Sequence, residues 1–142
     1  MMQVALTLLL SFTFLLLGLI HFNWVLGGRW SWDAALPTKE SGERVLNPGK
    51  VASLIVGIGL VVFALFYLLR GGFVSWSVPM WVLEYGSWIV PVLFLLRAIG
   101  DFKYVGFFKK IKETRFGVWD TRLFAPLCLA IALCGFVLVI FF

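Results

Sequence analysis

The sequence between Arg97 and Pro126 reads RAIGDFKYVGFFKKIKETRFGVWDTRLFAP. This stretch holds seven of the twelve Lys and Arg residues and three of the seven Asp and Glu residues. Outside it, and outside a shorter polar stretch at residues 27–50, the chain is almost entirely apolar. Most of the charge therefore lies in two segments that separate long apolar runs.

The composition indicates a membrane protein. The 142 residues are 62% hydrophobic and 13% charged, with a mean hydropathy of +1.03, whereas soluble domains are about 25% charged and 45–50% apolar. A helix needs roughly 20 apolar residues to cross ~30 Å of hydrocarbon. We therefore expect an all-α integral membrane protein, a single domain over residues 1–142. Its four transmembrane helices are expected at about 4–26, 51–69, 79–99 and 123–142.

The basic residues predict the orientation. Eleven of the twelve Lys and Arg residues fall in or beside loops 27–50 and 100–122, and only Arg70 falls on the opposite side. Cytoplasmic loops carry an excess of Lys and Arg, so we expect both loops in the cytoplasm and both termini outside. The net charge of +5 is explained in this way. No nucleic-acid partner is expected, because no recognition motif accompanies the charge.

Residues 102–113 show the pattern of an interfacial amphipathic helix. At 100° per residue, Tyr104, Phe107, Phe108 and Ile111 share one face and lysines occupy the other. Cations beside an anionic surface attract it by about 1 kcal/mol each. The residues predicted to bind anionic lipid are Lys103, Lys109, Lys110, Lys112 and Arg115. The alternative is a basic loop that only sets the orientation.

Several polar residues are expected at one depth, near the cytoplasmic ends of the helices, where they could form a pocket. Candidate catalytic residues are His21, Asp101 and Asp120, and candidate ligand-binding residues are Asn23, Arg97 and Arg122. Asp101 follows Arg97 at the i+4 spacing that permits an ion pair. Alternatively, His21 only fixes helix packing, Arg97 reaches lipid phosphates or pairs with Asp101, and both aspartates cap helices.

Other features are less informative. Glu84 is expected within the third helix, in the outer leaflet, where an acid could serve a transporter. Cys128 and Cys134 are expected to be apolar fillers of the last helix. The chain has no recognised metal-binding, nucleophile or phosphate-binding motif, so neither a metal nor a cofactor is expected.

Several segments together resemble a known family. They are HFNW at residues 21–24 with Gly27-Gly28, RAIGDF at 97–102, YVGFFK at 104–109, then Thr114, Asp120 and PLC at 126–128. The chain resembles a bacterial family of four-helix integral membrane proteins, domain of unknown function 3995. The resemblance implies the fold and a bacterial plasma (inner) membrane location, and it implies no activity.

Three functions remain open from the sequence. The first is a multi-pass membrane protein whose basic cytoplasmic face binds anionic lipid, a second copy of itself or another membrane protein. The second is a membrane-embedded enzyme or lipid-handling protein that uses the polar pocket. The third is a small oligomeric transporter that uses Glu84.

Overall fold

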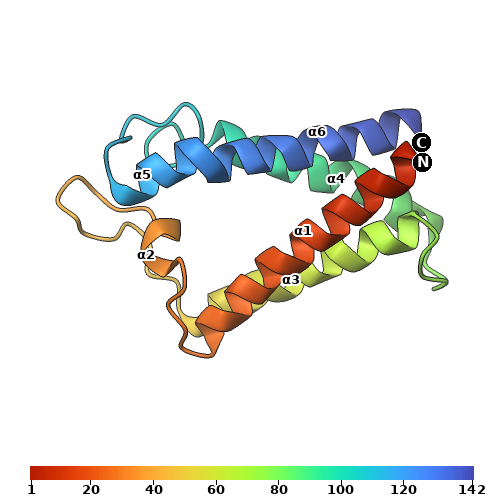
Figure 1. The fold of residues 1–142 in the computed structure, drawn as a ribbon, viewed down its shortest axis with the longest axis horizontal. Coiled ribbons are helices and arrows are strands. Elements are labelled where there is room, and N and C mark those ends of the chain that lie inside the picture. The colour runs from red at the N-terminus through yellow and green to blue at the C-terminus, as the bar shows by residue number, and fades with distance from the viewer.

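The computed structural model describes residues 1–142 and contains four long helical segments and no β-strand (Figure 1). They are α1 (Met2–Val25), α3 (Lys50–Arg70), α4 (Met80–Ile99) and a final segment, Arg115–Phe141. Each is long and apolar enough to cross a membrane. The prediction of four membrane-spanning helices is confirmed, and the architecture is that of a multi-pass membrane protein. A short helix, α2 (Trp32–Ala35), was not predicted.

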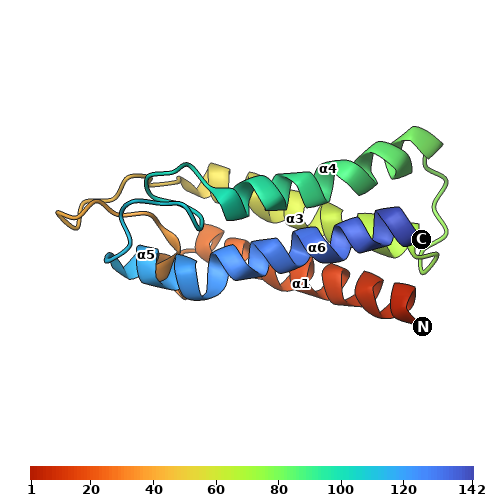
Figure 2. The ribbon, with the colours of Figure 1, turned by 90° about the horizontal axis from the view of Figure 1, so that it is seen from above.

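The helices form two antiparallel hairpins, α1 with α3 and α4 with the final helix (Figures 1 and 2). Small residues allow α1 and α3 to approach closely. A Cβ at Gly57 would lie 2.9 Å from a ring carbon of Phe22, and one at Gly18 would lie 3.1 Å from a methyl of Val61. Close approach through small residues is typical of helix pairs in membranes.

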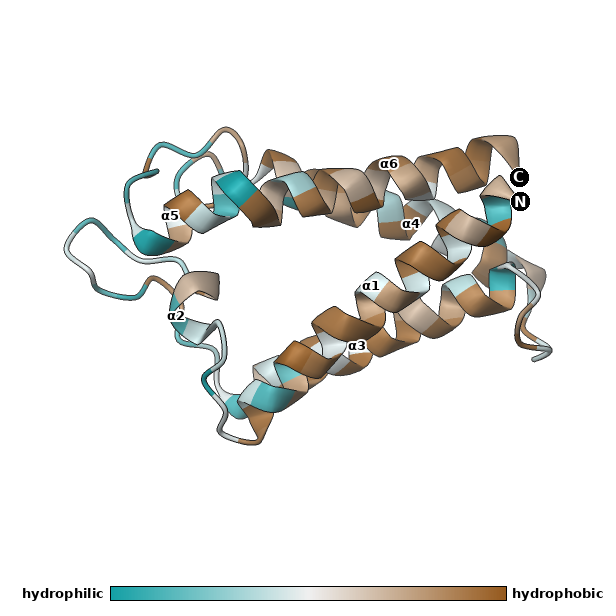
Figure 3. Cartoon of the chain, viewed as in Figure 1, coloured by the Kyte–Doolittle hydropathy of each residue, from teal (hydrophilic) through white to brown (hydrophobic).

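The hairpins meet at one end of the molecule and separate toward the other (Figure 1). The core that joins them includes Phe14 of α1, Tyr67 of α3 and Val90 of α4, all at most 2% exposed. Phe14 stacks on Tyr67, with ring centroids 5.8 Å apart. Both termini lie at the joined end, whereas α2 and the charged loops lie at the separated end (Figures 1 and 3).

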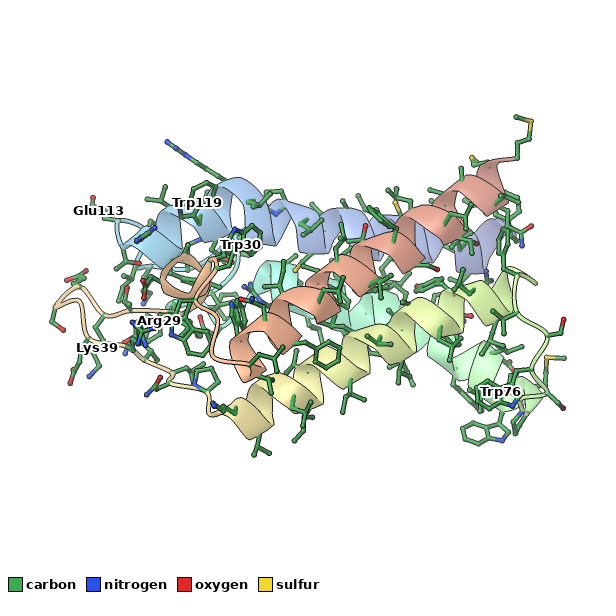
Figure 4. All side chains as sticks on the ribbon, turned by 60° about the horizontal axis from the view of Figure 1, so that its bottom comes forward. Arg29, Trp30, Lys39, Trp76, Glu113 and Trp119 are labelled. Carbon is green, nitrogen blue, oxygen red and sulfur yellow. The ribbon has the colours of Figure 1, made fainter.

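Exposed tryptophans mark both ends of the bundle. Trp30 and Trp119 lie at the end with the charged loops, and Trp76 lies at the opposite end (Figure 4). All three rings are between 45% and 67% exposed. Tryptophan is enriched at both membrane–water interfaces because its ring is amphipathic. These positions therefore fit a bundle whose long axis crosses the bilayer.

The predicted helix at 102–113 is wrong, because this segment is a loop. Gly100, Phe102 and Gly106 have φ values of 89°, 63° and 87°, in the left-handed region that an α-helix does not use. The two glycine backbones also pack together, so that a Cβ on either would overlap the backbone of the other side of the loop. The alternative of a basic loop describes this segment.

The final helix begins at Arg115, eight residues before its predicted start. Its parts are α5 (Arg115–Trp119), a π-helical turn η1 (Asp120–Phe124) and α6 (Ala125–Phe141). Thr114 caps it, because its hydroxyl accepts from the Gly117 N–H at 3.0 Å. Asp120 therefore lies inside the helix and is not a cap. Pro126 has no N–H for the carbonyl four residues earlier, and the Ala125 N–H bonds instead to the carbonyl of Asp120.

Candidate functional site

A pocket of about 340 Å³ lies where the two hairpins separate. Leu17 of α1, Val56 of α3 and Leu127 of α6 contribute to its apolar walls, and Ala35 and Leu36 cover it from the α2 side. Ten of its fifteen lining residues are hydrophobic. The polar or titratable side chains that line it are those of His21, Ser31, Ser53, Arg97 and Cys128. The pocket is therefore a largely apolar space with a few polar groups, as small-molecule sites in proteins usually are.

Arg97 connects the pocket to a buried cluster around Asp120. Arg97 Nη2 donates to Asp120 Oδ1 at 2.9 Å, and Lys109 Nζ lies 3.1 Å from Oδ2. The backbone N–H of Gly106 also donates to Oδ2, at 2.7 Å. Asp120 and the Lys109 side chain are fully buried. The carboxylate thus fastens the end of α4 and the loop after it to the final helix.

Lys109 is fully bonded within this cluster. Its ammonium group donates to the Gly106 carbonyl at 2.9 Å and to the Thr121 hydroxyl at 2.7 Å, besides Asp120. An ammonium group has three donors, and all three are used. We name Arg97, Gly106, Lys109, Asp120 and Thr121 the Asp120 cluster. It contains two cations and one carboxylate, so it carries one excess positive charge.

One nitrogen of Arg97 has no acceptor. Nη1 is buried and forms no hydrogen bond, although Nη2 of the same guanidinium is paired with Asp120. A buried polar group without a partner costs about 1–3 kcal/mol, and more when the group is charged. Arg97 lines the pocket and therefore brings the excess positive charge of the cluster to it.

His21 lines the same pocket from the opposite hairpin. Its Nδ1 lies 2.8 Å from the carbonyl oxygen of Leu17, and its ring packs on Trp24 with centroids 4.6 Å apart. Neither Asp101 nor Asp120 orients His21, because both carboxylates are engaged elsewhere. Of the six candidate pocket residues, His21 and Arg97 line one cavity, and Asp120 is bonded to Arg97.

Asp101 does not pair with Arg97, because Gly100 ends α4 with a left-handed turn and the chain changes direction there. Its Oδ1 accepts from the backbone N–H groups of Lys103, Tyr104 and Val105 at 2.7–2.9 Å. Partial burial raises the pKa of this carboxyl. The backbone hydrogen bonds outweigh that effect and hold the pKa below its usual value. Asp101 therefore stabilises the loop and is not part of the pocket.

Two other candidate ligand-binding residues also lie outside the pocket. Asn23 is exposed and faces Gly28, where the chain leaves α1. Arg122 is exposed on the π-helical turn. Of the five candidate lipid-binding cations, Lys109 is buried in the Asp120 cluster. The four others remain exposed at the same end of the molecule: Lys103, Lys110, Lys112 and Arg115.

The sequence reasoning missed Ser31, Ser53 and Cys128 as pocket residues. The apolar residues that follow Trp32 (Ala34, Ala35 and Leu36) were the available signal for a segment that folds back over the pocket. Glu84, the candidate transporter acid, is exposed on α4 and forms no ion pair. No group of three or more His, Cys, Asp or Glu side chains is placed to hold a metal ion.

Comparison with known proteins identifies the family of this chain. No curated protein and no solved structure matches the chain. The family model described as "Protein of unknown function (DUF3995)" matches residues 14–135, which include His21, Arg97, Lys109 and Asp120. Because this match extends over most of the sequence, the chain belongs to the DUF3995 family.

Proposed function

We propose that this protein binds an anionic amphiphile, with the chemistry of a membrane lipid, in the pocket between its two hairpins. The observation that carries the proposal is the Arg97 side chain, which lines a largely apolar cavity and is 35% exposed, while its carboxylate partner Asp120 is shared with Lys109. An oxygen of an anionic head group would accept from the accessible part of this guanidinium. Hydrogen bonds to charged groups contribute about 1.5–3 kcal/mol.

The charge of the Asp120 cluster supports an anion over a neutral ligand. Arg97 and Lys109 share one carboxylate, so one positive charge is not neutralised within the cluster. Buried charges are stabilised when they are paired. A singly or doubly charged head group beside Arg97 would complete the pairing, whereas an uncharged polar group would not.

The apolar walls support a ligand with a hydrocarbon chain. Hydrophobic side chains of α1, α3 and α6 face the cavity, and apolar contact contributes about 25 cal/mol per Å². A volume of about 340 Å³ is at the small end for ligand pockets. It suits a head group and the first part of a chain, with the remainder extending between the separated hairpins toward lipid.

The basic residues support an orientation for this site. Eleven of the twelve Lys and Arg residues lie in or beside the loops at the pocket end of the bundle. By the positive-inside rule this end faces the cytoplasm, so the ligand would enter from the inner leaflet of the plasma membrane. The exposed Lys103, Lys110, Lys112 and Arg115 would then lie beside anionic lipid head groups.

Ligand capture by the purified protein tests the proposal. Protein in phosphatidylcholine nanodiscs is exposed to decanoate, decyl phosphate or decanol, and native mass spectrometry reports what remains bound. Cys128 lines the pocket and Cys134 does not. In a Cys134→Ala background, an amphiphile in the pocket should therefore slow alkylation of Cys128 by a small maleimide.

The matched variants are Arg97→Met and Arg122→Met. Arg122 is an exposed arginine of the same end that does not line the pocket. We expect the anionic amphiphiles to bind and to protect Cys128, with at least a tenfold loss in Arg97→Met, since about 1.4 kcal/mol corresponds to tenfold. Arg122→Met should bind normally. Equal retention of decanol and the anions, or equal binding by both variants, would refute an anionic site at Arg97.

A further inference from the structure

We infer that the head group this pocket recognises is a phosphate monoester, held by Arg97 from one hairpin and His21 from the other. The inference rests on the proposed amphiphile site and names the chemistry of its ligand. Arg97 of α4 and His21 of α1 line the same cavity, so a head group between them would contact both hairpins where they separate.

The hydrogen bond of His21 fixes what its other ring nitrogen can do. Nδ1 lies 2.8 Å from the Leu17 carbonyl oxygen. A carbonyl oxygen only accepts, so Nδ1 must carry the hydrogen, and in a neutral imidazole Nε2 is then an acceptor. The ring is held in this position by the indole of Trp24. No group of the protein donates a hydrogen bond to Nε2.

Arg97 offers a hydrogen-bond donor to the pocket, whereas Nε2 of His21 is an acceptor. The Arg97 guanidinium lines the cavity, and a guanidinium group donates hydrogen bonds and cannot accept them. A ligand that satisfies both residues therefore needs an anionic oxygen for Arg97 and an acidic O–H for His21. The Ser31 and Ser53 hydroxyls also line the cavity and offer further partners for head-group oxygens.

A phosphate monoester carries both groups near neutral pH. Its second ionisation has a pKa of about 6, so one proton remains available to be shared between the phosphate and Nε2. If this proton resides on the phosphate, the P–OH donates to Nε2. If it resides on Nε2, the imidazolium donates to the dianion. A carboxylate, a sulfate monoester or a phosphodiester linkage has already lost its acidic proton, so Nε2 would have to take a proton from solvent before it could donate to such a group.

The net charge of the Asp120 cluster agrees with this head group. The cluster holds one unneutralised positive charge, and Arg97 is the only charged side chain that lines the pocket. A phosphate monoester with its proton shared with His21 presents one to two negative charges to it. The apolar walls require that the phosphate be attached to a hydrocarbon chain, so the ligand class is a lipid phosphate rather than free phosphate.

The test compares decyl phosphate with decyl sulfate, which share the chain and the tetrahedral head group and differ in the proton. Both are added to nanodiscs of phosphatidylcholine at matched bilayer concentrations, and binding is read by native mass spectrometry and by protection of Cys128 in the Cys134→Ala background. Wild type should bind decyl phosphate about tenfold more tightly than decyl sulfate, as one hydrogen bond to a charged group implies. Inorganic phosphate at the same concentration should not protect Cys128.

Two substitutions of His21 separate its roles. In His21→Asn the side-chain amide can keep the bond to the Leu17 carbonyl and lacks any equivalent of Nε2. This variant should lose the preference for decyl phosphate over decyl sulfate. In His21→Gln the longer amide reaches the place of Nε2 and should restore part of the preference. Thermal unfolding of each variant shows whether it is folded.

The outcomes distinguish the inference from the function on which it rests. If wild type binds decyl phosphate and decyl sulfate equally and Arg97→Met loses both, the amphiphile site stands and the phosphate monoester is wrong. If neither binds, or if Arg97→Met changes nothing, the proposed function fails as well. If inorganic phosphate protects Cys128 as fully as decyl phosphate does, the hydrocarbon chain is not recognised and a lipid ligand is refuted. The comparison in wild type decides the inference even if a His21 variant does not fold.

Discussion

Arg97 Nη2 lies 2.9 Å from Asp120 Oδ1, so a residue in the last turn of α4 is ion-paired with the π-helical turn before α6. Because Asp120 also pairs with Lys109, the substitution Asp120→Ala would leave two cations without their carboxylate. Removing one partner of a buried ion pair costs about 3–5 kcal/mol. We expect that loss in thermal or denaturant unfolding of the purified protein in detergent.

The exposed pair of Asp33 and Arg44 provides the control for Asp120. Its atoms are 2.7 Å apart, which is closer than in either pair of Asp120, but its side chains are 60% and 38% exposed. Exposed pairs contribute at most about 1 kcal/mol. Asp33→Ala should therefore change stability little. If the two variants lose equal stability, the Asp120 cluster is not a buried anchor.

The glycines of α3 predict a matched pair of substitutions. Gly57 faces α1, where a Cβ would lie 2.9 Å from a ring carbon of Phe22, whereas a Cβ at Gly59 would meet nothing within 4 Å. Overpacking a close contact costs about 1–3 kcal/mol. We expect Gly57→Leu to be destabilised by this amount and Gly59→Leu to be unchanged or slightly stabilised. Equal losses at both positions would mean that α1 and α3 do not approach through Gly57.

The loop at residues 100–106 should loosen in acid. Backbone hydrogen bonds hold the pKa of Asp101 below its usual value, so its ionised form stabilises the fold. This contribution is complete above the ordinary aspartate pKa of about 3.9 and is lost as pH falls through the lower value in the folded protein. Hydrogen exchange of the Lys103, Tyr104 and Val105 amides, corrected for the intrinsic rate, should therefore accelerate below about pH 4.

Asp101→Ala should show the fast exchange of these amides already at neutral pH, because it removes the acceptor. Exchange that is slow in Asp101→Ala, or that does not depend on pH in wild type, would show that the carboxylate does not order the loop.

The proposed orientation predicts the behaviour of fused reporters. A reporter that is active only in the cytoplasm should be inactive when fused after Phe142 and active when inserted near Gly42, at the tip of the loop between α2 and α3. The reason is the excess of Lys and Arg at the loop end of the bundle. Robust activity of the C-terminal fusion would reverse the orientation and place the pocket in the outer leaflet.

The sequence predicted the four spans because each apolar run is long enough to cross a bilayer. It placed His21 and Arg97 at one depth, where they could share a pocket, because both lie near the C-terminal ends of helices that run in the same direction; in the structure both line one cavity. It did not predict the bond of Lys109 to Asp120. That contact depends on the path of the loop between them, and the helical periodicity of 102–113 gave the wrong path.

Two glycines in the sequence indicate this path. Gly100 and Gly106 flank the aromatic segment, and both adopt positive φ, which returns the chain onto the end of α4. The Phe107 N–H then donates to the Ala98 carbonyl at 2.8 Å. The amphipathic pattern of 102–113 favours a helix. The positive φ of the two glycines and the three backbone hydrogen bonds to Asp101 favour a loop, and the loop is the structure that forms. The early start of the final helix had a comparable signal in the capping residue Thr114.

The π-helical turn at Asp120–Phe124 makes the number of residues in the final helix as important as their identity. Such a turn accommodates about one residue more than an α-helical turn. Deleting one residue between Asp120 and Phe124 would let the helix become regular. Because the π-helical turn contains the extra residue within one turn, Arg115–Trp119 would keep their alignment with α6. Deleting one residue within α6 instead would rotate the segment before it by about 100°. The hydrophobic length of the span would hardly change, yet the Asp120 carboxylate would turn away from Arg97.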